Sequence, residues 1–324
     1  MHLSLVQDKL NCSAPKGVLT NELKAELVRR KPEIIEILRR QSSGKHSPLA
    51  EIVPFFRTGD LPLTHAQERL WFLSQYEGGT SAYCIPVPLR LEGDLDRPAL
   101  ESALLRILER HEVLRTGYRS LNGRPDAFIG RADGWKVEYE ELPDTGTAEE
   151  RHRRLDRAML EFAQRPLDIS SPPLIRAKLF KVGVDVHVLL LQVHHIAADG
   201  WSISILAEEL LVLYPAILSQ TPAALPELPI QFVDYAAWHA STFGQDTLND
   251  EIAWWKRQLS GTLPVLELLS DRVRPPLLTF NGARDRFVLP GELQDRLRQF
   301  TQSSGTTLFM VLLAAFKVTL HRYT

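Results

Sequence analysis

The stretch VHHIAADGWS, residues 193–202, gathers two histidines, an aspartate and a glycine directly behind an apolar run. The preceding residues, VHVLLLQV, are typical of a central β-strand that is covered on both faces. Side chains alternate along a strand, so His194 and His195 are expected to point to opposite sides of the sheet, and only one of them can face a given cleft. An imidazole titrates near neutral pH, which suits it to hold or accept a proton during catalysis.

The alternation groups His195 with Leu191 and Val193, and Asp199 and Gly200 precede the next predicted helix, SISILAEELLVLY. Glycine permits close approach of a ligand to the backbone, and open α/β sheets bind ligands beyond the carboxyl ends of their strands. A polar turn that only satisfies backbone groups is the alternative. The cluster His-His-x-x-x-Asp-Gly at a strand end favours a functional site. One usable histidine and one aspartate are too few ligands for a metal, so no metal is expected.

The elements that must position this turn have an α/β pattern. LIRAKLFKV and VHVLLLQVHH read as consecutive strands joined by a hairpin at residues 183–185. THAQERLWFLSQY and RPALESALLRILER read as amphipathic helices. A proline-rich stretch, residues 221–229, separates this block from the tryptophan-rich helices FVDYAAWHA and EIAWWKRQL, and predicts a lobe boundary there.

Composition limits the class of protein. The chain has 324 residues, of which 44% are hydrophobic and 24% charged, as in ordinary globular proteins. A formal net charge of −2 gives no basic field for nucleic acid or a membrane surface. No apolar run reaches membrane-spanning length. The two cysteines, Cys12 and Cys84, are far apart and fit neither a disulfide framework nor a zinc site, which favours the cytoplasm.

Residues 1–41 form a separate small unit in this interpretation. HLSLV and KLNCSA predict two short strands, and two short helices follow them. Such a unit buries little surface alone and should dimerise or dock on another protein. The small, polar residues that follow predict a linker over 42–59.

Four segments together resemble the condensation domains of nonribosomal peptide synthetases. HHIAADGWS is similar to their HHxxxDG signature, and THAQERLWFL, RHEVLRTGY and QFVDYAAWH resemble their other motifs in the same order. The resemblance implies an α/β fold of two lobes, like that of chloramphenicol acetyltransferase. The N-terminal lobe would span 60–222, and 223–324 would be the start of an incomplete C-terminal lobe. Its last segment predicts one long helix, Leu293 to Tyr323.

The N-terminal unit is similar to docking domains of the TubC type, without the helix that normally precedes the two strands. This resemblance implies that residues 1–41 bind the C-terminal tail of an upstream synthetase or polyketide synthase, and that a homodimer can form through them. A β-strand edge can accept an extended peptide through main-chain hydrogen bonds. Lys9, Lys16, Lys24, Arg29 and Arg30 favour an acidic tail.

Condensation domains form an amide bond between an upstream acyl or peptidyl thioester and a downstream aminoacyl thioester in secondary-metabolite biosynthesis. Both substrates ride on phosphopantetheine arms of carrier proteins, so the resemblance implies no bound cofactor and no metal. It assigns the catalytic role to His195, as a base or a positioning group. His194, Asp199 and Gly200 would support the turn, and Arg115 would form a structural ion pair with Asp199.

Two other functions compete with this one. A stand-alone HHxxxDG acyltransferase that uses a CoA thioester would share the turn and the two-lobed fold, but would need neither a docking unit nor the other three motifs. A docking or interaction protein that carries a truncated, inactive enzyme lobe is the non-catalytic alternative.

Overall fold

A computed structural model describes residues 2–6, 9–13, 29–31, 51–57, 59–76, 81–243, 245–273, 275, 280, 282, 283 and 285–324 of the chain. Contacts divide the chain into two compact units, one through Gly244 and the other from Gln245 to Thr324. Each unit is described by itself.

The N-terminal segment contains a two-stranded antiparallel sheet. Strands β1 (His2–Val6) and β2 (Lys9–Ser13) pair with Leu5 opposite Leu10. This confirms the two strands predicted for the segment. The two helices predicted after them lie outside the described residues, apart from residues 29–31.

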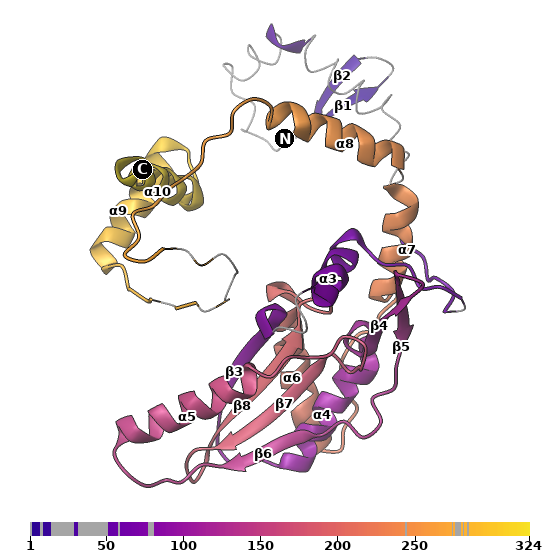
Figure 1. The fold of residues 1–324 in the computed structure, drawn as a ribbon, viewed down its shortest axis with the longest axis vertical. Coiled ribbons are helices and arrows are strands. Elements are labelled where there is room, and N and C mark those ends of the chain that lie inside the picture. Colours follow the sequence, from indigo (N-terminus) through magenta and orange to yellow (C-terminus); the bar gives the residue numbers. More distant parts are fainter. Residues whose placement is uncertain are drawn as a thin grey trace. The chain divides into compact units, whose positions relative to one another are not determined.

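A four-stranded sheet organises the first unit (Figure 1). Its strands are β3 (Cys84–Glu92), β6 (Val137–Glu141), β7 (Ile175–Lys181) and β8 (Val186–His194), in the order β3-β8-β7-β6. β8 is antiparallel to both of its neighbours, whereas β6 and β7 are parallel. From His187 onward every residue of β8 is buried. The sequence prediction of a central, covered strand and of a hairpin before it is therefore confirmed.

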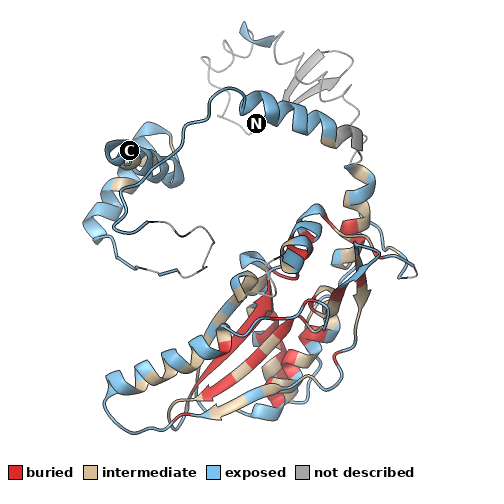
Figure 2. Cartoon of the chain, in the orientation of Figure 1, coloured by how far each residue is buried: buried red, intermediate tan, exposed pale blue. Residues whose placement is uncertain are grey.

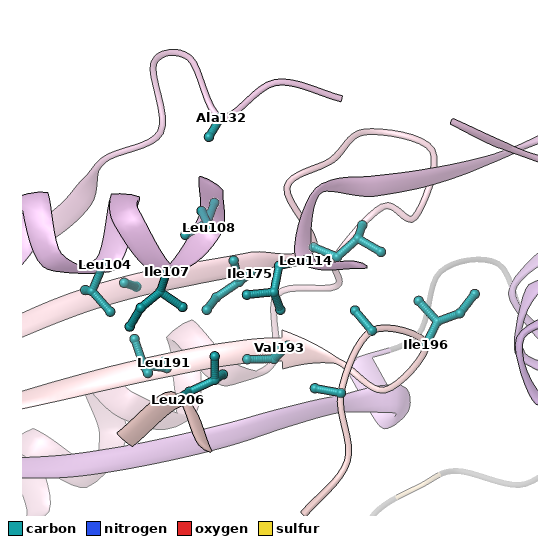
Figure 3. Close-up of a cluster of buried hydrophobic side chains, with 14 of the residues drawn as sticks. Leu104, Ile107, Leu108, Leu114, Ala132, Ile175, Leu191, Val193, Ile196 and Leu206 are labelled. Carbon is teal, nitrogen blue, oxygen red and sulfur yellow. The ribbon is translucent and has the colours of Figure 1, made fainter. Parts of the chain in front are cut away.

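Helices cover both faces of this sheet. α4 (Arg97–Arg110) and α6 (Gly200–Leu218) pack on one face, where side chains of α4, β7, β8 and α6 form a common core (Figure 3). α5 (Ala148–Ala163) packs on the other face through Phe162, against Phe180, Val188 and Leu190. Alternate residues of β8 supply the two cores, as a two-sided strand requires. Figure 2 shows the buried residues gathered in these layers.

Further elements complete the first unit around the end of β8. α3 (His65–Tyr76) is followed by a short 3₁₀ turn, Ser81–Tyr83. A second 3₁₀ turn, Glu112–Arg115, leads into the hairpin of β4 (Thr116–Leu121) and β5 (Arg124–Ile129). Asn122 and Gly123 form its two-residue loop, with φ of 52° and 77°. Such positive angles fit a hairpin turn whose twist matches the strands.

By length and hydropathy alone, α6 could cross a membrane. The same test is met by core helices of globular proteins, and α6 contributes Leu206, Leu210 and Leu213 to the core that it shares with α4. Its apolar character is therefore accounted for by packing within the first unit.

The compact units do not test the lobe boundary predicted at 222/223, which stays a prediction. Helix α7 (Phe232–Thr242) belongs to the first unit, and the division falls between Gly244 and Gln245. The reason is that Asp234 of α7 bonds to Arg57 and to the N–H of Phe55, and so ties α7 to the first unit.

The second unit contains α8 (Gln245–Gln258), α9 (Gly291–Ser304) and α10 (Leu308–Tyr323). The prediction of one long helix from Leu293 to Tyr323 is wrong, because the chain bends by 106° between α9 and α10. Gly305 causes the break by adopting a left-handed conformation that ends α9, and Thr307 caps α10. On α10 the apolar side chains of Phe309, Leu312, Leu313 and Phe316 are exposed, and Figure 2 shows most of this helix in the colour of exposed residues.

Candidate active site

Backbone hydrogen bonds hold the turn that follows β8. The N–H of His195 donates to the carbonyl oxygen of Tyr83 over 2.7 Å, and the N–H of Ala197 donates to that of His194 over 2.9 Å. Tyr83 directly precedes β3, and the last pair between β3 and β8 is Cys84 with His194. The bond from His195 to Tyr83 therefore extends this pairing by one residue and fixes the backbone of His195. The position of His195 is set by main-chain contacts, which leave its side chain available.

His195 differs from its predicted surroundings. β8 ends at His194, so the alternation that groups His195 with Leu191 and Val193 stops before it. Leu191 and Val193 are buried in the core, whereas His195 is exposed. Within the described part of the chain, its imidazole has no hydrogen-bond partner. An exposed, unengaged imidazole at a fixed backbone position is free to act on a substrate.

His194 is buried, with only 3% of its surface exposed. The N–H of Ile196 donates to its Nδ1 over 3.1 Å, so the proton of the neutral ring resides on Nε2. Burial, with a smaller contribution from His195, lowers the pKa of His194 to about 4. This histidine is therefore neutral at pH 7 and shapes the turn through its ring.

Asp199 caps the first turn of α6. Its Oδ1 accepts from the N–H of Ser202 over 2.8 Å and from the Ser202 hydroxyl over 2.7 Å. These bonds from Ser202 lower the pKa of the Asp199 carboxyl. Gly200 follows as the first residue of the helix, and a Cβ added there would meet no atom of the described structure within 4 Å. The turn thus leaves open space beside Gly200.

The predicted ion pair between Arg115 and Asp199 does not form in this structure. Arg115 donates to the carbonyl oxygen of Gly130 over 3.0 Å and to that of Glu109 over 3.5 Å. Asp199 is exposed and its carboxylate is already engaged by Ser202. The carboxylate of Asp199 is already bonded within its own helix cap. Arg115, in the 3₁₀ turn before β4, instead bonds to Gly130 just after β5.

Residues of the THAQERLWFL motif make structural contacts. Gln67 accepts from the N–H of Thr64 over 3.0 Å and donates to the hydroxyl of Tyr118 over 2.8 Å. Trp71 is buried in the core, whereas Arg69 is exposed. These contacts join α3 to β4 near the turn.

A buried carboxylate of α7 joins two distant segments. Asp234 is 1% exposed and accepts from the N–H of Phe55 over 2.7 Å, from Arg57 over 2.5 Å and from the N–H of Gln231 over 2.6 Å. Burial alone would raise the pKa of this carboxyl, but the bonds from Arg57 and the two backbone groups lower it. The sequence gives no sign of Arg57 as the partner, because no local spacing relates it to residue 234.

A second cluster that the sequence did not predict links α4 to α6. Glu209 is 6% exposed, and its carboxylate accepts from Nε of Arg110 over 2.9 Å and contacts Nε2 of His111 over 2.7 Å. The signal for it is a glutamate inside the apolar helix SISILAEELLVLY, since buried charges are normally paired. The cluster fixes α6, the helix that begins at Gly200 directly after the turn with His195.

The site therefore consists of an exposed histidine at the end of a central strand, followed by a capped helix, within an α/β layered unit. Among the described residues, no group of three or more His, Cys, Asp or Glu side chains could hold a metal ion. Residues 57–324 match the family model of the condensation domain, and residues 1–40 match that of the TubC N-terminal docking domain. The chain belongs to the condensation-domain family, and it carries an N-terminal docking domain of the TubC type.

Known proteins agree with this assignment. A linear gramicidin synthase polypeptide of Brevibacillus parabrevis is 38% identical over 291 residues, which cover 90% of this chain and 4% of that much longer protein. The X-domain from teicoplanin biosynthesis has a similar structure, with a TM-score of 0.71 and 30% identity over 84% of this chain and 59% of that one. A structure on condensation domain-mediated chain release from the enacyloxin polyketide synthase has a TM-score of 0.64 and 27% identity, over 99% and 61% of the two chains. The predicted family, a condensation domain of nonribosomal peptide synthetases, is confirmed.

Proposed function

We propose that the synthetase carrying this domain uses it to join an upstream acyl or peptidyl thioester to the amine of a downstream aminoacyl thioester. In this reaction the amine nitrogen attacks the thioester carbonyl carbon. The carbon–sulfur bond then breaks, and the departing thiolate takes up a proton as the amide forms. Holding both substrates in reacting geometry supplies much of the rate, as in other two-substrate reactions.

His195 is the catalytic residue in this proposal. The observation that carries it is the exposed imidazole of His195, held at the end of β8 by a 2.7 Å main-chain bond to Tyr83. From this position its ring accepts the proton of the attacking amine or orients the amine by a hydrogen bond. His194, Asp199 and Gly200 shape the turn around it.

The experiment is a condensation assay on the intact synthetase with two loaded carrier proteins. The change His195→Ala should lower the rate about 10²- to 10⁴-fold, which is the usual contribution of a positioned base. His152→Ala, on the exposed face of α5, is the matched control and should retain the rate. A wild-type rate with His195→Ala would refute the catalytic assignment.

Two rival functions predict different results in the same assay. A stand-alone acyltransferase would accept the acyl group from its CoA thioester as readily as from a carrier protein. A protein-binding module would form no amide at all. The second rival has structural support from a solved complex of the X-domain and OxyB from teicoplanin biosynthesis. A chain of that complex is 30% identical to this chain and has a TM-score of 0.69. The retention of His194, His195, Asp199 and Gly200 favours catalysis.

The substrates arrive on phosphopantetheine arms of upstream and downstream carrier proteins in this proposal, and the domain binds no cofactor or metal of its own. Both cysteines fit a cytoplasmic location. Amide formation that requires an added metal ion would contradict this part.

The docking unit, residues 1–41, captures the C-terminal tail of an upstream synthetase or polyketide synthase and can form a homodimer. The antiparallel pair β1–β2 has an outer edge on each strand to which an extended peptide can add. Calorimetry with acidic C-terminal peptides should detect binding that weakens with salt. Absence of binding at low salt would refute the docking role, and sedimentation of the segment would decide its oligomeric state.

A further inference from the structure

A pocket of about 410 Å³ lies beside the active-site turn, entirely within the first unit. Its wall comes from the end of α3, from Tyr83, from β4 and from residues 166–170, which follow α5, and His194 closes it. Side chains alternate along β8, so His194 lies on the same face of the sheet as Leu190 and Gln192. Residues 166–170 lie on this face and line the pocket together with His194. The size is in the range of small-molecule sites.

The pocket contains one hydrogen-bond donor whose orientation is fixed. The Nδ1 atom of His194 accepts a hydrogen bond from the N–H of Ile196, so the proton of the neutral ring is on Nε2. Nε2 has no partner within the described part of the chain, yet it is not one of the fully buried side-chain atoms that lack one. Nε2 therefore keeps some solvent-accessible surface, and His194 lines this pocket.

The charged side chains around the pocket already have bonding partners within the chain, although Asp168 keeps its negative charge. Asp168 accepts from the N–H and the hydroxyl of Ser170 over 2.9 and 2.7 Å, and from the Ser171 hydroxyl over 3.1 Å. Arg119 pairs with Asp126 over 2.6 Å. Leu167, Ile169 and the ring of Tyr118 supply buried apolar surface. A wall of this kind accepts a neutral, partly apolar group more readily than an anion.

We propose that this pocket holds an uncharged acyl or aminoacyl group of one thioester substrate, and that the Nε2–H of His194 donates a hydrogen bond to a carbonyl oxygen of that group. The proposal rests on the amide-forming function proposed above. It gives the two histidines separate tasks: His195 acts on the reacting centre, and His194 binds the chain attached to it.

Nuclear magnetic resonance on the ¹⁵N-histidine-labelled 324-residue chain tests the proposal. The probe is N-acetyl-alanyl pantetheine amide, a stable analogue of an aminoacyl thioester, and its partner has a trans alkene in place of each of the acetyl and alanyl amides, so it is also neutral but lacks both carbonyl oxygens. At pH 7 the spectrum should place the His194 proton on Nε2. The carbonyl probe should shift this Nε2 signal and bind about tenfold more tightly than the alkene compound, as the loss of one hydrogen bond implies. A proton on Nδ1, or equal affinity for both compounds, would overturn the proposal.

A pocket-filling variant provides a second, independent measurement. Ser120 lines the pocket and is exposed, so Ser120→Trp should block the space without disturbing the core. It should weaken probe binding at least tenfold, and unchanged binding would contradict the proposal. His195→Ala separates this result from the proposed function, because it should lower the rate of amide formation in the synthetase about 10²- to 10⁴-fold while the labelled chain still binds the probe through His194.

Discussion

Asp199 and Ser202 cap each other at the start of α6. The Ser202 N–H and hydroxyl both donate to Oδ1 of Asp199, over 2.8 and 2.7 Å, and the N–H of Asp199 donates back to the Ser202 hydroxyl over 3.2 Å. The negative charge also lies at the positive end of the helix dipole. The role of Asp199 in this structure is therefore to begin a helix at a fixed place behind His195.

Replacing Asp199 by alanine should lower the free energy of unfolding by about 1 kcal/mol, the usual cost of losing a capping side chain. Asp199→Asn should retain most of that stability, because an amide oxygen also accepts from the N–H of Ser202. Urea denaturation of the three proteins measures both values. A double-mutant cycle with Arg115→Ala should give a coupling energy near zero, and a coupling of several kcal/mol would restore the ion pair that the sequence predicted.

The stability of the first unit should fall as the pH drops from 6.5 toward 4. Burial lowers the pKa of His194 from 6.5 to about 4, so in this interval the unfolded chain binds a proton that the folded chain does not. The contribution of His194 to the free energy of unfolding is therefore complete above pH 6.5. It is lost as the pH falls, and the loss is roughly 2 kcal/mol at pH 5. The pKa values of His187 and His239 are also lowered by burial and act in the same direction.

The comparison of His194→Gln with wild type assigns this pH dependence. The variant should show a flatter curve of unfolding free energy against pH than wild type, whereas His152→Gln, on exposed α5, should match wild type. Identical slopes for His194→Gln and wild type would show that His194 is not the group responsible.

Removal of the Asp234 carboxylate should detach α7 from the segment that precedes α3. Asp234→Ala leaves the N–H groups of Phe55 and Gln231 without their acceptor and Arg57 with Glu112 as its one carboxylate partner, and should cost about 3 kcal/mol. Arg57→Ala should cost less, because the Arg57 side chain is 30% exposed and Asp234 retains two backbone donors. Thermal unfolding measures the loss, with exposed Asp94→Ala as the control. Equal stability of Asp234→Ala and the control would contradict the role of Asp234.

Glu209 should contribute more to the free energy of unfolding of the first unit than its neighbour Glu208. Glu209→Ala removes the acceptor of both Arg110 and His111 between α4 and α6, and should lower the free energy of unfolding by about 2 kcal/mol. Glu208 is exposed on the same helix, and Glu208→Ala should change it by less than about 0.5 kcal/mol. Denaturant titration of the two variants measures both losses. Equal losses of unfolding free energy would contradict the stabilising role of Glu209 between α4 and α6.

Local patterns in the sequence were sufficient for most of the layered fold. The apolar run of β8, the hairpin before it and the amphipathic helices α3, α4 and α6 were predicted because burial imposes a period of two on strands and about 3.6 on helices. The family and its motif histidines were also predictable, because the HHxxxDG signature is a short, contiguous segment. The break at Gly305 was missed, because apolar side chains recur on both sides of it and only the left-handed backbone of the glycine separates two helices.

Pairings between distant residues were decided by the tertiary structure. The resemblance to condensation domains implied Arg115 as the partner of Asp199, but Arg115 bonds to Gly130 beyond the end of β5, and Asp199 bonds to Ser202 in the helix cap. Arg57 with Asp234, and Glu209 with Arg110 and His111, meet only because the sheet and its helices bring separate segments together. The two adjacent histidines also acquired opposite environments in this way. A strand's alternation fixes the direction of a side chain, but burial, hydrogen-bond partners and pKa depend on which other segments pack around it.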